Sequence, residues 1–158
     1  MGLKIKSKPF GEIEIENPVV IEFKESIIGF EFHKKYVILD ADTESAFKWL
    51  QSISDPNLAF IVIPPEAFYF NYKLEVSLQD LKSIGLDDPQ EVTCLVIVVV
   101  PEDPSQMSAN LQAPIVINPK NYLAKQMLSL NPQYTVRHKI LDELQHSLLQ
   151  KEKAVNQK

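Results

Sequence analysis

Short apolar stretches separated by turn residues fill the first two thirds of the chain. Ile13 and Ile15 alternate with glutamates, which is the two-residue period of a half-exposed strand. Further strands are predicted over residues 19–23, 36–39, 47–53 and 59–63. Strands at such close spacing predict a mainly β fold, either an antiparallel barrel or a sandwich.

Residues 92–100 form the most apolar segment of the chain. They are rich in β-branched side chains and are bounded by Pro89 and Pro101, so we predict a central strand buried on both faces. Cys94, the single cysteine, lies inside this segment. A buried, inert thiol is therefore the favoured interpretation, and a reactive nucleophile is the alternative.

Helical signals appear after the first strands. Ser77 is a candidate N-cap, with Asp80 near the positive end of the helix dipole, and Gly85 is expected to end this short helix. A second helix is predicted from Asn118 as cap and Pro119 as first residue, with an apolar face of Leu123, Met127 and Leu130.

The last helical pattern begins after Val136. Ile140, Leu144 and Leu148 recur at helical spacing, so a C-terminal helix is predicted, followed by a polar tail. We expect two units, a domain over residues 1–137 and a helical extension over residues 138–158.

Charge and composition narrow the function classes. The 158-residue chain is 45% hydrophobic and 23% charged, as in an ordinary globular protein. Its apolar runs are too short to span a bilayer, and the lysines near the N-terminus argue against a signal peptide, so a cytoplasmic protein without membrane contact is expected. The net charge of −5 and the single arginine, Arg137, disfavour nucleic-acid binding and suit a basic protein partner.

The residues that usually perform catalysis are few and scattered. The three histidines lack the spacing of a metal site, and the four glycines form no phosphate-binding loop. One predicted turn carries a cluster of three carboxylates, Asp40, Asp42 and Glu44. A solvated turn is the favoured interpretation, and a catalytic acid–base pair is the alternative. We therefore expect no metal, no cofactor and no enzymatic activity.

The loop before the strand at 115–117 carries two amides. Asn110 and Gln112 each offer a donor and an acceptor, and neither can act as a base or nucleophile at neutral pH. The loop suits recognition of another polypeptide, although the amides could instead satisfy the backbone of the chain itself.

Four aromatic residues crowd into one short segment. Phe68, Tyr69, Phe70 and Tyr72 cannot all face inward, whichever period the segment adopts, so at least one is expected at the surface. Glu75 follows closely, and an exposed aromatic residue beside a carboxylate is typical of a protein-binding hot spot. Ordinary core and rim positions are the alternative.

Several segments, taken in order, resemble the FliW family of flagellar assembly factors. Gln126 and Tyr134 also fit the C-terminal pattern of that family, whereas the proline usual before Gly29 is absent. The resemblance runs roughly from Ile5 to Arg137. The matching segments are Phe10–Ile13, Ile28–Glu31, Trp49–Ser52, Phe60–Val62, the aromatic patch ending at Tyr72, and above all Asn110–Asn118.

The resemblance implies a small antiparallel β-barrel-like domain with short peripheral helices. It also implies a non-enzymatic cytoplasmic protein, expected to be a monomer, that binds two partners in turn. One partner is newly made flagellin and the other is the translational regulator CsrA. Once flagellin is exported, the free protein is expected to bind CsrA away from its RNA surface and to relieve repression of flagellin synthesis.

By analogy, the partner surface is expected around five residues. Glu75 would pair with a cation of the regulator, Tyr72 would contact an apolar anchor, and the amides would hydrogen-bond its backbone. The predicted site is Tyr72, Glu75, Asn110, Gln112 and Pro114. The predicted core includes Phe30, Trp49 and Phe60.

Two other functions remain open from the sequence. A chaperone for flagellin without a regulator role would leave the same residues at the surface. A small-ligand-binding barrel would use the turn at Asp40–Glu44 and would need an ionisable pair with a tuning cation, which the sequence does not display.

Overall fold

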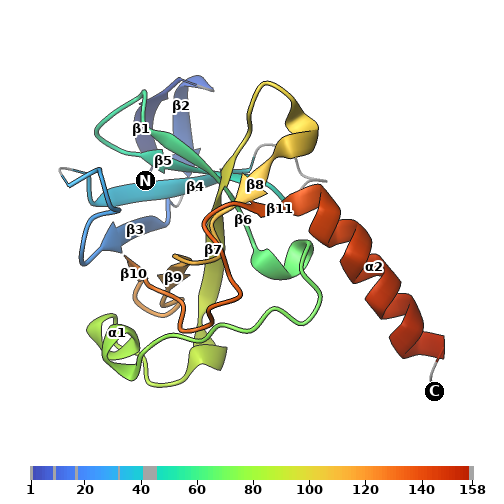
Figure 1. Ribbon diagram of the computed structural model, residues 1–158. Helices are drawn as coiled ribbons and strands as arrows, with labels where there is room; N and C mark the ends of the chain where they lie inside the picture. The colour runs from blue at the N-terminus through green and yellow to red at the C-terminus, as the bar shows by residue number, and fades with distance from the viewer. Residues whose placement is uncertain (1, 9, 17, 32, 41–45, 157–158) are drawn as a thin grey trace.

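A computed structural model describes residues 2–8, 10–16, 18–31, 33–40 and 46–156, with side chains as far as residue 150. Seven strands close into a barrel in which each pairs with its neighbours in the order β7-β6-β5-β4-β3-β10-β9 and back to β7 (Figure 1). These strands are β3 (Val20–Phe23), β4 (Lys35–Asp40), β5 (Lys48–Ser52), β6 (Ala59–Ile63), β7 (Thr93–Val99), β9 (Ile115–Ile117) and β10 (Leu123–Gln126).

Two pairings between distant parts of the chain close the barrel. β10 runs parallel to β3, with Leu123 opposite Glu22. β9 runs antiparallel to β7, with Ile117 opposite Thr93. The other neighbouring strands in the ring are antiparallel, so the predicted mainly β, antiparallel barrel-like fold is confirmed.

One edge of β7 has two successive partners. β9 pairs with its first half, and β8 (Ser108–Ala109) pairs with Val98 and Val99 in its second half. Residues 110–114 leave the sheet between these two strands. β11 (His138–Lys139) pairs with β8 and ends this branch of the sheet.

The first two strands form a separate hairpin over the barrel (Figure 1). β1 (Gly2–Ser7) and β2 (Gly11–Glu16) pair antiparallel. The Ser7 hydroxyl donates to the Gln51 side-chain oxygen at 2.8 Å, and the ring of Phe10 meets the edge of Trp49 with centroids 6.4 Å apart. These contacts fix the hairpin on β5.

The buried side chains form three clusters. The largest fills the barrel and includes Ile21, Tyr36, Leu50 and Val62. A second cluster lies between β7–β8 and the C-terminal helix, and a third packs the short helix α1 against Val116 and Met127. Burial of these apolar faces is the main stabilising contribution to the fold.

The helices are peripheral. They are the 3₁₀ turns η1 (Pro65–Ala67), η2 (Pro89–Glu91) and η3 (Pro104–Gln106), and the α-helices α1 (Leu78–Ser83) and α2 (Ile140–Asn156). The Ser77 hydroxyl accepts from the Asp80 N–H at 3.1 Å, and Gly85 follows α1 with a φ of +84°, so the predicted cap and stop are confirmed. No helix within the described residues is both long and apolar enough to cross a bilayer.

The C-terminal helix α2 touches the barrel along its first turns and then extends away from it (Figure 1). Ile140 is buried and Leu144 packs against the second cluster. The Ser147 hydroxyl accepts from the Phe70 N–H at 2.8 Å and donates to Glu143, whose carboxylate also contacts the His138 ring at 2.7 Å. The described part of α2 is therefore attached through its N-terminal half.

Most predicted strands are confirmed, including β7. Its predicted burial on both faces is only partly correct, because Val99 is 60% exposed and Cys94 is partly exposed. The predicted helix after Asn118 is wrong: residues 123–126 form β10, between β3 and β9. Asn118 accepts from the Lys120 N–H at 2.9 Å, and Tyr122 adopts a φ of +60°, so the chain turns back into the sheet. The spacing of apolar residues here satisfied both a helix and a short strand, and tertiary pairing decided.

The predicted core placement of Phe30 is also wrong. Its side chain is exposed, although its ring meets Phe60 edge-on with centroids 5.0 Å apart. Trp49 and Phe60 are each partly buried on the barrel wall. Gly29, with a φ of +92°, turns the chain outward just before Phe30.

Candidate functional site

The amide loop is the excursion between the two partners of β7. The Asn110 N–H still donates to the Ile97 carbonyl at 2.9 Å, so the loop starts in register with the sheet. The Asn110 side-chain oxygen then accepts from the Ala113 N–H at 3.0 Å and closes a turn. The conformation of the loop is therefore fixed by the chain's own hydrogen bonds.

A second segment, residues 127–135, holds the outer side of this loop. The Ser129 N–H donates to the Gln112 carbonyl at 2.7 Å, and the Leu111 N–H donates to the Thr135 carbonyl at 2.9 Å. Gln126 supports the junction, because its side-chain amide donates to the Ala113 carbonyl at 3.2 Å. The loop and residues 127–135 thus form one irregular layer outside the barrel.

The segment from Tyr72 to Glu75 borders the same layer from its other side. The Leu130 N–H donates to the Glu75 carbonyl at 2.7 Å. The Tyr72 ring stacks on Tyr134, with centroids 5.0 Å apart and planes inclined by 19°. The Lys73 N–H donates to the Tyr134 hydroxyl at 3.1 Å. Residues 127–135 therefore connect both halves of the predicted site.

Four exposed side chains stand along this layer, and we call them the ridge: Glu75, Gln112, Leu128 and Leu130. The two leucines are 62% and 65% exposed although they sit in a well-bonded segment. A leucine held out in water by a fixed backbone, beside a carboxylate and an amide, is a feature of protein-binding surfaces.

The five predicted site residues differ in accessibility. Glu75 and Gln112 are exposed, Tyr72 and Asn110 are half-buried, and Pro114 is buried. The Pro114 carbonyl accepts from the Met127 N–H at 2.9 Å, so this residue supports the layer from within. Of the four crowded aromatic residues, Phe68 is buried and the others are partly exposed, in agreement with the expectation that they cannot all face inward.

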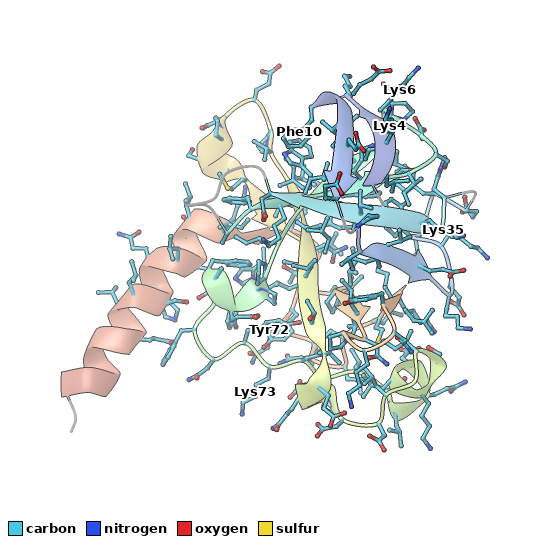
Figure 2. All side chains as sticks on the ribbon, turned by 180° about the vertical axis from the view of Figure 1, so that it is seen from behind. Lys4, Lys6, Phe10, Lys35, Tyr72 and Lys73 are labelled. Atoms are coloured by element: carbon cyan, nitrogen blue, oxygen red, sulfur yellow. The ribbon has the colours of Figure 1, made fainter. Side chains whose placement is uncertain are left out.

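A pocket of about 550 Å³ opens beside the ridge, and we call it the acidic pocket. Glu66 from η1 and Glu75 contribute carboxylates, and Gln90 from η2, Tyr72 and Cys94 also line it. Neither carboxylate forms an ion pair with any residue that the structure describes. Figure 2 labels Tyr72 and Lys73 at this end of the molecule, well separated from Phe10 on the hairpin.

Two groups that line the pocket, Cys94 and Tyr72, stay protonated. Burial, together with charge repulsion from the nearby Glu66 carboxylate, raises the pKa of Cys94 from 9.0 to about 12. Burial likewise raises the pKa of Tyr72, with Cys94, Tyr134 and Glu66 adding to the shift. A protonated thiol is a poor nucleophile, which agrees with the inert thiol favoured for Cys94.

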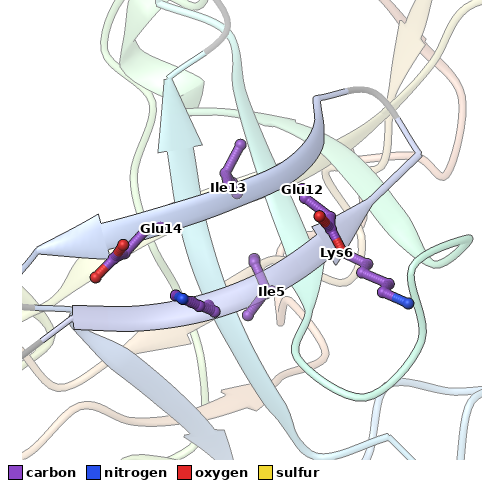
Figure 3. Close-up of a pocket in the computed structure, with 6 residues that line it drawn as sticks. Ile5, Lys6, Glu12, Ile13 and Glu14 are labelled. Atoms are coloured by element: carbon purple, nitrogen blue, oxygen red, sulfur yellow. The ribbon is translucent and has the colours of Figure 1, made fainter.

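Other surface hollows contain none of the predicted site residues. One, of about 410 Å³, lies along the hairpin, where Ile5 and Ile13 are flanked by Glu14 on one side and by Glu12 and Lys6 on the other (Figure 3). Its lysines face glutamates across the strands, so its charges balance.

The second hollow is an apolar groove of about 240 Å³ near the far end of β7. Trp49, Ile61, Val100 and Met107 are among the residues that line it. The described residues of its lining include no carboxylate, which distinguishes it from the acidic pocket.

The residues considered for catalysis do not form a site in the described part of the chain. Asp40 ends β4 and pairs with Lys48, while Asp42 and Glu44 lie outside the described residues. His33 hydrogen-bonds the Ser54 hydroxyl at 3.4 Å, and His138 contacts Glu143. Within the described ranges, no three His, Cys, Asp or Glu side chains gather as a metal would need.

Sequence reasoning missed three residues of this region: Glu66, Leu128 and Leu130. The leucines were hidden by the wrong helix after Asn118, which placed Leu130 on a buried face. A usable signal was present in the sequence. Ser129 lies between the two leucines, and the Asn131-Pro132 pair that follows them favours an extended or turning chain over a helix. Glu66 follows Pro64-Pro65, and no local pattern marks its approach to Cys94.

The comparisons with known proteins agree with one another. The family model described as FliW protein matches residues 4–140. The flagellar assembly factor FliW of Leptospira interrogans serogroup Icterohaemorrhagiae serovar Lai is 45% identical over 143 residues, covering 90% of this chain and 95% of the relative. That of Ruminiclostridium cellulolyticum is 40% identical, covering 89% and 96%. A crystal structure of the flagellar assembly factor FliW superposes with a TM-score of 0.78 at 34% identity, covering 87% of this chain and 96% of its own.

Proposed function

The chain belongs to the FliW family of flagellar assembly factors, and from that premise we propose that it acts without catalysis, by binding protein partners in the cytoplasm. The proposed partners are newly made flagellin and the translational regulator CsrA. Flagellin occupies the protein while it is abundant. After flagellin is exported, the free protein binds CsrA at a surface remote from its RNA site and relieves repression of flagellin synthesis.

The observation that carries this proposal is the ridge. Leu128 and Leu130 are held in water by backbone hydrogen bonds to residues of the adjoining segments, so their exposure is fixed before any partner arrives. Such preorganisation lowers the entropic cost of binding. The net charge of −5 and the single arginine suit a basic protein partner and disfavour RNA.

Each predicted site residue has a role in this proposal. The Glu75 carboxylate pairs with a cation of the regulator, and Gln112 donates to and accepts from its backbone. The Asn110 oxygen is used inside the loop, so its NH₂ group is the part offered to the partner. Tyr72 supports the surface by stacking on Tyr134, and the buried Pro114 fixes the course of the loop.

Calorimetric titration of the purified protein with CsrA and with flagellin tests the proposal. Glu75→Lys is expected to weaken CsrA binding by at least about 30-fold, because it replaces one half of a desolvated charge pair by a like charge. Glu102→Lys is the matched control, since Glu102 is exposed in the loop beyond the far end of β7. Equal affinities for the two variants would remove Glu75 from the surface.

Competition separates the regulator switch from a chaperone with flagellin as its only client. Protein preloaded with flagellin is expected to release it, or to refuse CsrA, when the two are mixed at comparable concentrations. Binding of flagellin, together with no capture of CsrA by the flagellin-free protein at micromolar concentration, would support the chaperone alternative. A large thermal shift with a metabolite and none with either protein would support the small-ligand alternative.

A further inference from the structure

The acidic pocket has a composition that the ridge does not share. Two carboxylates, Glu66 and Glu75, line it, and among the described lining residues only Lys73 is basic. Neither carboxylate is neutralised by an ion pair within the described residues, and the Glu66 charge is felt as far as Cys94 and Tyr72. The negative potential of these two carboxylates attracts a cation and repels an anion.

The lining of the pocket suits a long side chain with a charged tip. Leu74 and Val92 add apolar lining that an alkyl stem can contact, and the exposed carboxylates of Glu66 and Glu75 can pair with its charged head. The Tyr72 hydroxyl is enclosed, so an incoming side chain contacts the carboxylates and not this hydroxyl.

The position of the pocket favours a protein as the source of that cation. The Glu75 backbone is bonded to Leu130 of the ridge, so a protein seated on the ridge covers the entrance of the pocket. A free metal ion is a poor fit. Among the described residues, no three His, Cys, Asp or Glu side chains lie close enough together to hold one.

We propose that the acidic pocket receives one lysine or arginine side chain of the protein that binds the ridge, with Glu66 and Glu75 as its counter-ions. This inference rests on the proposed function, and it adds Glu66 to the binding surface. It also makes the pocket, and not the charge of the whole surface, the element that selects a basic partner.

Calorimetry with purified CsrA tests the inference through charge-neutralising variants. Glu66→Gln is expected to lower the affinity about tenfold, and Glu66→Gln combined with Glu75→Gln about 100-fold. Glu102→Gln carries the same change in net charge far from the pocket and is expected to stay within about twofold.

The outcomes separate this inference from the proposed function. Equal effects of Glu66→Gln and Glu102→Gln would overturn the pocket and leave the ridge in place. Failure of the unaltered protein to bind either CsrA or flagellin would overturn both. Thermal melts of each variant establish that it is folded.

A second arm tests the source of the cation. N-acetyl-arginine amide and spermidine are titrated against the protein alone, and weak binding in the millimolar range is expected for both. Micromolar binding of either small cation, abolished by Glu66→Gln, would identify a small-molecule site and overturn the assignment to a protein side chain.

Discussion

The wall of the barrel and the ridge hold their residues in different ways. In β4, β5 and β6 the backbones pair in continuous registers, and the side chains Leu50 and Val62 are completely enclosed. Along the ridge the backbone is held by isolated hydrogen bonds to neighbouring segments, and the leucines are exposed to water. The wall stabilises the fold by burying apolar side chains, while the ridge presents a fixed surface and contributes little to stability.

This contrast explains how a small domain can expose apolar residues. Irregular segments lose the regular ladder, so their backbone groups need individual partners, and side chains such as Asn110, Asn118 and Gln126 supply them. Polar side chains therefore do on the ridge side what strand pairing does in the wall. Substitutions on the two sides should consequently fail in different assays.

The largest loss of stability is expected in the wall. Leu50→Ala removes a side chain with no exposed surface and leaves a cavity in the barrel, so the free energy of unfolding should fall by about 2–5 kcal/mol. Urea denaturation measures the change. Leu148→Ala, at a leucine that is 54% exposed on α2, is the control and should shift the midpoint very little. A loss below about 1 kcal/mol for Leu50→Ala would contradict the assignment of stability to the wall.

The next effect concerns a polar side chain that replaces strand pairing. Asn118 is 2% exposed, and its side chain donates to the Ile84 carbonyl at 2.8 Å. Asn118→Ala removes this short hydrogen bond to a buried acceptor, so the free energy of unfolding measured in urea should fall by about 1–3 kcal/mol. Asn121 reaches the same carbonyl at 3.4 Å from a more exposed position. Asn121→Ala should cost less, and the reverse order would refute the role given to Asn118.

A pH series should show a smaller effect at the border between wall and pocket. Burial raises the pKa of Cys94 from 9.0 to about 12, so between pH 8 and pH 10 the thiol ionises in the unfolded chain and stays protonated in the folded one. The stabilising contribution is complete below pH 9 and is lost as the pH rises towards 12.

The loss between pH 8 and pH 10 amounts to about 1 kcal/mol. Urea denaturation at the two pH values measures it, with Cys94→Ala as the reference that cancels the tyrosines and lysines. Parallel pH dependence of the two proteins would show that the thiol ionises freely in the folded state.

The smallest change in stability is expected on the ridge. Leu130 is 65% exposed, so Leu130→Ala should alter the free energy of unfolding by less than about 0.5 kcal/mol while lowering affinity for CsrA about tenfold. Val99→Ala, at a residue 60% exposed at the far end of β7, should change neither quantity. Equal binding of the two variants would erase the distinction between wall and ridge.

The sequence predicts several regular elements well because their signals are local. Alternation in β2, the apolar run in β7, and Ser77 with Gly85 around α1 each specify one element without reference to the rest of the chain. Residues 123–126 escaped this approach, because a short apolar stretch fits either a helix or a strand. Their partners, β3 and β9, decided the outcome.

The candidate site was predicted in part. Glu75 and Gln112 were identified from their chemistry and are exposed, but Pro114 lies inside and Asn110 uses its oxygen in a turn. Such differences depend on which backbone groups remain unpaired after folding, and no single-sequence pattern reports that. Glu66 approaches Cys94 only because η1 and β7 pack together.

The pairing of Glu22 in β3 with Leu123 in β10 has a consequence for synthesis. A chain still on the ribosome cannot close the barrel until Gln126 has left the exit tunnel, because β10 is the last barrel strand in the sequence. Until then the earlier strands form an open sheet with bare edges, a target for proteases and for other nascent chains. A chain that stops before Gln126 therefore lacks part of the strand that closes the barrel.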